Sequence, residues 1–348
     1  MHWEPADIPD QTGRTALVTG PTVGGLGHFT ALELARKGAR VVLAGRSPEK
    51  VETASREIRR EVPDAALESL TLDVSRLDSV RRAAAEAGRF GAIDLLVNNA
   101  GVMGTPYERT DEGLEMQMAT NHFGPFLLTG LLLPQLVASG DARVVTVSST
   151  FHRLAGSPPL GDPRQPGGRY HRWRVYGQSK LANLLFVGEL DRRMTAAGLP
   201  VRALAAHPGF AGTHLAANGQ YGRSSGGIAS ILDAGIRAVS QSAAAGAAPT
   251  LMAATADLPG DTFVGPSNLG QMQGPRAPWA GPGWRRTGSP PRACGRSARR
   301  RWVWSTPDPR VLDRCAAAAP QPPVRPGRWS WASATRPGRR RRGATLSR

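Results

Sequence analysis

Residues 15–27 read TALVTGPTVGGLG, an apolar run that leads into a turn with four glycines. The run at 15–20 predicts a buried strand, and a helical pattern follows from about Phe29 to Lys37, where Gly38 ends it. Glycines at such a turn let the backbone approach a pyrophosphate, which the helix N-terminus attracts. The turn predicts either a dinucleotide site or an ordinary tight strand–helix connection. The residues of that site would be Gly20, Gly24, Gly25, Leu26 and Gly27.

The alternation of apolar runs and helical patterns continues along the chain. It predicts parallel βαβ units, and the Val/Ile/Leu-rich runs favour a sheet covered on both faces. We therefore expect an α/β fold: a single Rossmann-type, doubly wound domain at residues 13–270, with a seven-stranded parallel sheet. Residues 1–12 form an N-terminal extension. The other predicted strands are 40–44, 68–72, 93–97, 143–148, 201–206 and 261–264. The other predicted helices are 48–61, 76–88, 112–138, 176–197 and 243–256.

The basic character of the chain is confined to its C-terminal part. The 348 residues carry a formal net charge of +17, and the 18 Arg and 2 Asp from Pro275 onward supply +16 of it. This stretch also holds six of the eight Trp and has no helical or strand period. We expect residues 275–348 to form an irregular, disordered tail. Its composition is typical of a natural basic tail or of GC-rich DNA read out of frame, and both alternatives stay open.

The remaining composition favours a cytoplasmic protein. Both cysteines lie in the tail, so the body offers no disulfide framework and no thiolate metal site. The first ten residues lack the apolar segment of a secretory signal. The most apolar stretch, 123–137, is interrupted by Gly and Pro and is too short to span a bilayer. The histidines show no metal-ligand spacing. We expect no metal, no transmembrane segment and no specific nucleic-acid partner, and leave a homo-oligomer open.

The end of the second strand indicates which nucleotide binds. A carboxylate there would bind a ribose 2′-hydroxyl and favour NAD. Here the sequence reads LAGRS at 43–47, and no acidic residue occurs before Glu49. Arg46 can pair with a 2′-phosphate, so we predict NADP(H) as the cofactor. The alternative is that Arg46 is a solvated surface residue.

Tyr176 and Lys180 form the most specific short pattern in the chain. The chain has only 4 Tyr and 3 Lys, yet these two are four residues apart at the start of a helical pattern. That spacing places both side chains on one helix face. A Tyr that acts as a base near pH 7 needs its pKa lowered by about 3 units, roughly 4 kcal/mol, which a nearby cation favours. The pair therefore predicts an acid/base site, with an ordinary helix surface pair as the alternative.

Together these segments resemble the short-chain dehydrogenases/reductases over residues 13–266. The resemblance is strongest to the branch of the retinol dehydrogenases, the WW-domain oxidoreductase and protochlorophyllide reductase. The matching segments are NNAGVM at 98–103, NHFGPFLL at 121–128, VSS at 147–149, YGQSKLAN at 176–183 and HPG at 207–209, followed by Thr213.

The resemblance implies a role for each matching residue. Tyr176 would exchange a proton with the substrate oxygen, and Lys180 would hold the nicotinamide ribose and lower the Tyr176 pKa. Ser149 would bind the substrate oxygen, and Asn121 would position a water. Ser148 competes with Ser149, but strand alternation favours the later serine. The remaining cofactor contacts would be Asp73 and Val74 at the adenine, Asn99, Ala100 and Gly101 along the cleft, and Pro208, Gly209 and Thr213 at the nicotinamide.

Two departures from the family pattern affect these expectations. Four residues separate Gly20 from Gly25, where the family usually has three, so either Gly24 or Gly25 would fill the matching position. The irregular tail also occupies the place of the family's last helix, which helps to close the substrate pocket. The segment 156–174 is expected to be either a surface excursion near the substrate mouth or a plain solvated loop.

The sequence thus predicts an NADP(H)-dependent enzyme that transfers a hydride to or from a small-molecule carbonyl or alcohol, expected by resemblance to be lipophilic. Two alternatives remain open. The same groups would support reduction of a C=C bond, and an altered C-terminus would leave a nucleotide-binding or scaffold protein without turnover.

Overall fold

A computed structural model describes residues 3–156, 170–209, 242–268 and 273–278. The chain divides into two units, Met1–Ser305 and Thr306–Arg348, and all the described residues belong to the first. The predicted contact Thr213 and the predicted tail beyond Pro278 lie outside the described residues.

The sheet has eight strands in the order β3-β2-β1-β4-β5-β6-β7-β8. The first seven in chain order pair in parallel, so the predicted seven-stranded parallel sheet is confirmed. The strand order reverses between β1 and β4, and ligands bind at the carboxyl ends of the strands at such a switch point. The strand bounds are β1 Thr15–Thr19, β2 Arg40–Gly45, β3 Leu67–Thr71, β4 Leu95–Asn98, β5 Ala142–Val147, β6 Val201–Ala206, β7 Phe263–Asn268 and β8 Gln273–Pro278.

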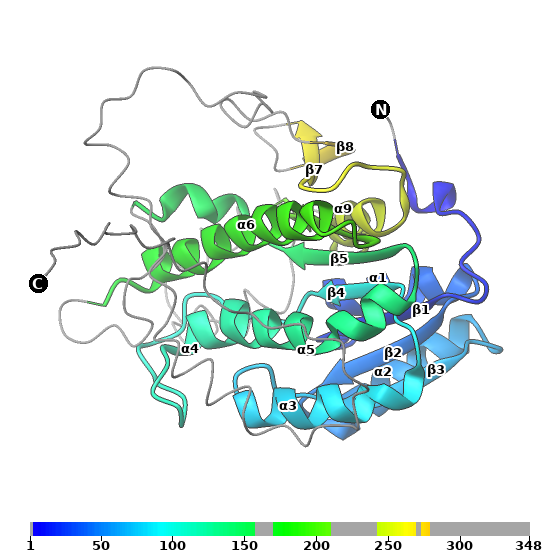
Figure 1. Ribbon diagram of the computed structural model, residues 1–348, viewed down its shortest axis with the longest axis horizontal. Helices are drawn as coiled ribbons and strands as arrows, with labels where there is room; N and C mark the ends of the chain where they lie inside the picture. Colours follow the sequence, from blue (N-terminus) through cyan, green and yellow to red (C-terminus); the bar gives the residue numbers. More distant parts are fainter. Residues whose placement is uncertain (1–2, 157–169, 210–241, 269–272, 279–348) are drawn as a thin grey trace, which may run out of the picture. The chain divides into compact units, whose positions relative to one another are not determined.

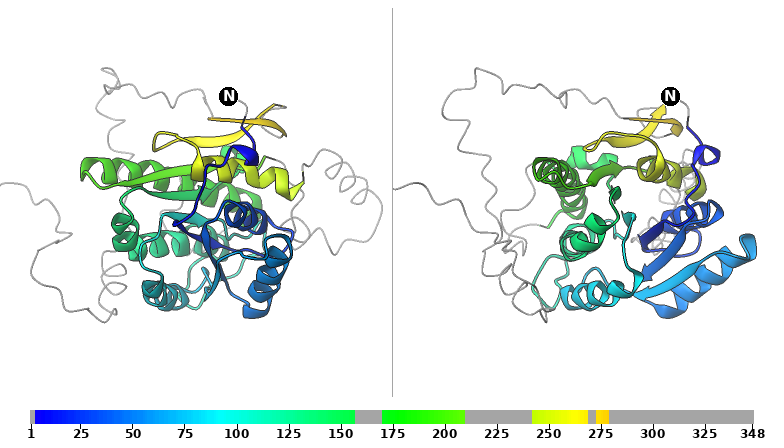
Figure 2. Two further views of the ribbon diagram at one scale, coloured as in Figure 1. Left: turned by 90° about the vertical axis from the view of Figure 1, so that its right-hand side faces the viewer. Right: turned by 45° about the vertical axis from the view of Figure 1, so that its right-hand side comes forward.

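Helices cover both faces of the sheet (Figure 1, Figure 2). Alternate residues of β1 divide between two cores: Ala16 and Val18 pack with α1, α2 and α9, whereas Leu17 packs with α3, α5 and α6. This division is the doubly wound arrangement expected from the sequence. The helix bounds are α1 Leu26–Arg36, α2 Pro48–Glu61, α3 Leu77–Glu86, α4 Met116–Met118, α5 Gly124–Ala138, α6 Arg172–Ala196 and α9 Ala243–Thr255. Short helices are η1 Pro5–Asp7, η2 Ala87–Phe90 and η4 Thr150–Leu154, and η3 Ala119–Phe123 is a π-helix.

The prediction of one continuous helix over 112–138 is wrong. Gly113 has a left-handed φ of 78°, and the Glu115 side chain caps the helix that starts at Met116. The π-helical turn η3 then separates α4 from α5. The sequence pattern did not specify the cap at Glu115 or the π-helical turn, because hydrogen bonds of the folded chain set both of them.

Both ends of the predicted domain also differ from expectation. The N-terminal extension contributes Trp3 and Ile8 to the core beside α1 and α9. At the other end, β8 pairs antiparallel with β7, and its last residues, 275–278, fall within the segment predicted as tail. Residues 275–278 are therefore part of a strand and not of an irregular tail. Within the described residues, no helix has the length and apolar character needed to cross a membrane.

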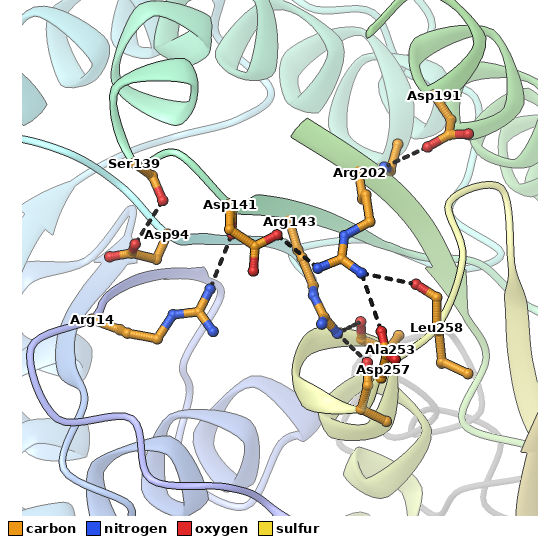
Figure 3. A network of polar contacts seen from close by, with 12 residues as sticks. Arg14, Asp94, Ser139, Asp141, Arg143, Asp191, Arg202, Ala253, Asp257 and Leu258 are labelled. Atoms are coloured by element: carbon orange, nitrogen blue, oxygen red, sulfur yellow. Dashed lines mark hydrogen bonds and ion pairs between the residues drawn. The ribbon is translucent and has the colours of Figure 1, made fainter. Parts of the chain in front are cut away.

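The amino ends of the strands are joined by a polar network (Figure 3). The buried Arg143 of β5 donates to the carbonyls of Ala253 and Ala256 at the end of α9. Arg202 of β6 pairs with Asp141 at 2.7 Å and donates to Leu258 O at 3.3 Å. Cations at a helix C-terminus satisfy its free carbonyls and its dipole. The network therefore fixes α9 to the sheet at the edge opposite the switch point.

Candidate active site

The glycine turn after β1 is shaped for close backbone approach. Gly20 has a φ of 70°, and a Cβ on it would lie 3.0 Å from Ala100 Cα. A Cβ on Gly27 would lie 2.5 Å from both Gly20 O and Asn99 Nδ2. Side chains at these two positions would push the turn away from the strand ends. Both glycines are therefore needed for the close packing of this turn against the segment at 99–100.

The two glycines that the sequence left open have different roles. Gly24 adopts a φ of 75°, which favours glycine. Gly25 is the extended N-cap of α1, which begins at Leu26 rather than near Phe29. Gly24 thus makes the turn and Gly25 starts the helix. Leu26 and Gly27 occupy the first helical turn, where the helix N-terminus faces the strand ends.

Thr19 was missed by the sequence analysis and joins the turn to β4. Its hydroxyl donates to Val97 O at 3.2 Å and accepts the backbone N–H groups of Asn99 and Ala100, both at 3.0 Å. Asn99 Nδ2 donates back to Thr19 O at 2.8 Å. The only sequence signal was its position as the last residue of the first strand. These bonds hold the predicted cleft residues against the glycine turn.

The predicted adenine-side residues lie at the ends of β2 and β3. Arg46 directly follows β2 and is exposed, and no carboxylate of the described residues forms an ion pair with it. The carboxylate of Asp73 accepts from Ser75 N at 2.9 Å and from Ser75 Oγ at 2.6 Å. Val74 is buried, and a Cβ on Gly124 would lie 1.9 Å from its carbonyl oxygen. The loop after β3 is thus fixed against α5, while Arg46 is available to a ligand.

Tyr176 and Lys180 are buried side by side on α6, which begins at Arg172 rather than at Tyr176. Lys180 Nζ lies 5.6 Å from the Tyr176 ring centroid and donates to Val147 O at 3.1 Å. Burial lowers the pKa of Lys180 to about 8. Burial raises the pKa of Tyr176 to about 12, against the lowering effect of a hydrogen bond with Ser149. The expectation of a lowered Tyr176 pKa is therefore not met by these side chains, because desolvation outweighs the hydrogen bond with Ser149.

The two adjacent serines point to different partners. Ser148 Oγ donates to Lys180 O at 2.9 Å and is buried beneath α6. Ser149 meets the Tyr176 side chain and accepts from Phe151 N at 3.3 Å at the start of η4. The structure thus places Ser149 beside the phenol, whereas Ser148 anchors the helix that carries it.

Asn121 lies in the π-helical turn η3, a local geometry that is frequent at functional sites. Its Oδ1 accepts from Val102 N at 2.7 Å, and its Nδ2 donates to Val102 O at 2.9 Å and to Ser179 Oγ at 2.9 Å. Ser179 donates in turn to Tyr176 O at 2.7 Å. A Cβ on Gly101 would lie 3.0 Å from Asn121 Oδ1. Asn121 therefore links residues 101–104, which we call the cleft loop, to α6.

Two histidines that looked unremarkable in the sequence border the site. His207 Nδ1 accepts from Gly209 N at 3.2 Å, and its buried ring lies 5.0 Å from that of Phe263. His152 Nδ1 lies 2.7 Å from Ser149 O. Burial lowers the pKa of His207 to about 3, so this ring is neutral near pH 7. His207 thus supports the turn that carries Pro208 and Gly209, the last two predicted contacts among the described residues.

The fold gathers most of the predicted residues at the carboxyl ends of the parallel strands. The turn after β1 and the segment 99–101 adjoin each other, as do Asn121, Ser149, Tyr176 and Lys180. No cluster of three or more His, Cys, Asp or Glu side chains suited to a metal occurs in the described part of the chain.

Known proteins resemble this chain in sequence and in fold. The family model for short chain dehydrogenases matches residues 14–161. Human retinol dehydrogenase 13 is 44% identical over 211 residues, which cover 60% of this chain and 62% of the human protein. The match therefore spans less than two thirds of that relative's length.

Solved structures extend the similarity. An uncharacterized protein from Mycobacterium paratuberculosis is 43% identical, with a TM-score of 0.64 over 80% of this chain and 89% of that one. An NAD(P)-dependent gluconate 5-dehydrogenase from Beutenbergia cavernae, solved with bound NADP, is 25% identical, with a TM-score of 0.53 over 71% of this chain and 91% of its own.

Proposed function

The chain belongs to the short-chain dehydrogenase/reductase family, in the branch that includes retinol dehydrogenases 12 and 13, and we propose a function on that premise. The protein is an NADP(H)-dependent oxidoreductase. It transfers a hydride to or from a carbonyl or alcohol substrate, with Tyr176 as general acid/base. The observation that carries the proposal is the buried Tyr176 phenol, which has the Ser149 side chain and the Lys180 ammonium beside it.

The protonation of the site supports reduction of a carbonyl. With a pKa of about 12, Tyr176 is a neutral phenol near pH 7 and can donate its proton to the substrate oxygen. Ser149 donates a second hydrogen bond to the same oxygen. Lys180, with a pKa of about 8, can hold or release a proton close to neutral pH. The cofactor, when bound, supplies the hydride.

The cofactor assignment rests on the glycine turn and on Arg46. The close approaches at Gly20 and Gly27 exclude side chains, which is the role that glycines have in a turn that binds a pyrophosphate. Arg46 is positioned after β2, where its guanidinium can pair with a ribose 2′-phosphate. The relative from Beutenbergia cavernae was solved with NADP. Asn99, Ala100, Gly101, Lys180, Pro208 and Gly209 would hold the nicotinamide half.

A lipophilic substrate is supported by the side chains beside the phenol. The Phe151 ring lies 5.6 Å from the Tyr176 ring and 5.7 Å from the Trp173 ring, centroid to centroid. Such aromatic side chains favour an apolar ligand. The relatives named as retinol dehydrogenases agree with that chemistry. The cytoplasmic location and the oligomeric state stay predictions.

A substrate screen tests the proposal. The full-length protein is incubated with NADPH and with lipophilic aldehydes, ketones and enones, and both the loss of NADPH absorbance and the products are measured. We expect aldehydes or ketones to give alcohols. Saturation of the enone C=C bond alone would select the alternative double-bond reductase. Tight NADPH binding without any turnover would instead select a nucleotide-binding protein.

A further inference from the structure

Glu115 is a fully buried carboxylate at the start of α4. It accepts from Gln117 N at 3.0 Å, from Met118 N at 2.7 Å and from the Tyr170 hydroxyl at 2.8 Å. The first two bonds cap a helix, but the third reaches a residue just before α6, 55 positions along the chain. The carboxylate therefore joins the segment that carries Asn121 to the segment that leads into Tyr176.

Gln117 extends this connection to the cleft loop. Its side chain is also fully buried. Its Nε2 donates to the Tyr170 hydroxyl at 2.7 Å and to Arg172 O at 3.0 Å, while its Oε1 accepts from Gly104 N at 2.8 Å. The Tyr170 hydroxyl thus donates to Glu115 and accepts from Gln117. We call these three residues, Glu115, Gln117 and Tyr170, the Glu115 cluster.

The cleft loop is held at both of its ends. At one end, a Cβ on Gly101 would lie 3.0 Å from Asn121 Oδ1 and 3.6 Å from Lys180 Nζ. At the other, Gly104 has a φ of 63°, and a Cβ there would lie 2.9 Å from the Trp173 ring. Residues 101–104 therefore run from the catalytic lysine to the aromatic side chains next to the phenol. The bond from Gly104 to Gln117 sets the second end.

We propose that the Glu115 cluster is a positioning device, which holds the cleft loop and the start of α6 in the relative placement that the substrate side of the site requires. This inference rests on the proposed oxidoreductase function. None of the three residues touches the reacting atoms. Instead, the cluster determines where Gly104 and Trp173 lie with respect to Tyr176.

The physics of a buried polar network supports this role. A buried carboxylate is costly unless its oxygens accept hydrogen bonds, and Glu115 has three donors. Burial still raises its pKa, although the three donors oppose the rise. Burial and the nearby Glu115 also raise the pKa of Tyr170, so its hydroxyl keeps the donated proton. A shift of about 1 Å at a reacting centre can lower a rate by about a hundredfold, so such fixed geometry matters to turnover.

The test removes one atom. Tyr170→Phe deletes the hydroxyl that links Glu115 to Gln117 and keeps the ring. Tyr107→Phe is the matched control, because its ring lies 5.2 Å from that of Tyr170 and its hydroxyl accepts from the exposed Arg109. We expect Tyr170→Phe to raise KM for the carbonyl substrate and to lower kcat, about tenfold in kcat/KM, with the NADPH Kd within about twofold. The control should leave all three constants unchanged.

A second readout separates this inference from the proposed function. Amide hydrogen exchange is measured on the full-length protein, and residues 101–104 and 172–176 should exchange faster in Tyr170→Phe but not in Tyr107→Phe. Unchanged exchange in those segments would overturn the inference, whether or not the protein turns over. So would a lower melting temperature with unchanged kcat and KM, since that result shows a role in stability alone. Absence of turnover by the unsubstituted protein would count against the proposed function only.

Glu115→Gln provides an independent variant. The glutamine keeps the shape, but its amide nitrogen cannot accept, so at least one of the three donors loses its partner. We expect the same kinetic pattern as for Tyr170→Phe and a larger loss of stability. A glutamine variant that folds and has normal KM, kcat and exchange would contradict the inference.

Discussion

The two ends of the sheet each bury one cation, and they do so differently. Lys180, at the carboxyl ends of the strands, is 4% exposed and donates to one carbonyl oxygen, Val147 O. Arg143, at the amino ends, is 5% exposed and donates to the carbonyls that end α9 (Figure 3). Burial lowers the pKa of Lys180 to about 8 and that of Arg143 to about 10.

The difference between the two pKa values fits the proposed role of each end of the sheet. Near pH 7 Arg143 stays charged, so it can stabilise the helix end permanently. The pKa of Lys180 lies within about one unit of pH 7, as expected for a group that takes part in proton transfer. Burial shifts the pKa of its neighbour Tyr176 upward to about 12, so the phenol keeps its proton near pH 7. One end of the sheet therefore uses a fixed charge for stability, while the other holds a cation whose charge can change.

The largest expected effect is the loss of kcat after a substitution at the carboxyl ends of the strands. Tyr176→Phe keeps the ring and its packing against Phe151 but removes the proton that the phenol donates. We expect kcat to fall about a thousandfold, which is the range for loss of a general acid. The NADPH Kd and the melting temperature should stay close to those of the unsubstituted protein. Steady-state kinetics and fluorescence titration measure the two effects, and near-normal turnover would rule out the acid/base role.

A substitution at the amino ends of the strands should instead lower stability and leave kcat unchanged. Arg143→Met leaves the carbonyls of Ala253 and Ala256 without their cationic donor. We expect a loss of about 3 kcal/mol in the free energy of unfolding, because buried acceptors of a charged donor lose their partner. The kcat of the folded protein should not change. Denaturant unfolding and kinetics on the same sample check both statements.

Arg202→Met is the control for that experiment. Arg202 is partly exposed, and its partner Asp141 is largely exposed. Its removal should cost less than about 1 kcal/mol, as is usual for ion pairs near the surface. Equal losses for the two arginines would show that burial of Arg143 is not what matters at this end.

A smaller effect is expected from Arg46, which belongs to the carboxyl end but lies outside its buried part. Arg46→Ala should raise the NADPH Kd about 10- to 100-fold, since a charge-assisted contact to a phosphate contributes about 1.5–3 kcal/mol. The NADH Kd should change by less than about twofold, because NADH lacks the 2′-phosphate. Isothermal titration of both nucleotides makes the comparison. Similar weakening of NADH and NADPH would contradict the assignment of Arg46 to the 2′-phosphate.

The carboxyl end was the more predictable of the two. Its fold follows from local patterns: apolar strands, the glycine turn, and the four-residue spacing of Tyr176 and Lys180 on one helix face. The strand order confirms the predicted sheet, and the family model and the retinol dehydrogenase relative confirm the family resemblance. The amino-end network was not anticipated, since Arg143 meets α9 through contacts 110 and 113 residues away along the chain.

Long-range contacts also explain what was missed within the site. The Glu115 cluster depends on bonds between residues 53 and 55 positions apart, which no periodicity reveals. The breaks around α4 depend on the Glu115 cap and on the left-handed Gly113, and both are properties of the folded backbone. Burial, which sets the direction of the Tyr176 pKa shift, is likewise a property of the folded chain.

The last expected effect concerns the pH dependence of stability at the two ends. The pKa of Lys180 is about 8 in the folded protein against an ordinary 10.5. Between these values the unfolded chain binds more protons than the folded one, so the free energy of unfolding rises with pH in this window. Arg143, whose pKa is lowered from 12.5 to about 10, and Tyr176, whose pKa is raised from 10.0 to about 12, act only above pH 10. Of the two buried cations, Lys180 rather than Arg143 therefore changes the stability between pH 8 and 10.

Lys180→Met isolates that contribution. It replaces the buried ammonium by an apolar side chain of similar length, so the penalty for burying the charge disappears below pH 8. From pH 7.5 to 10, we expect the free energy of unfolding to rise by about 2 kcal/mol more in the unsubstituted protein than in the variant. Denaturant unfolding at several pH values gives the free energy of unfolding against pH for both proteins. The Arg143→Met variant should show the same pH dependence as the unsubstituted protein, at a lower stability. Parallel curves for Lys180→Met would mean that Lys180 keeps an ordinary pKa, and the contrast between a fixed and a changeable buried cation would then fail.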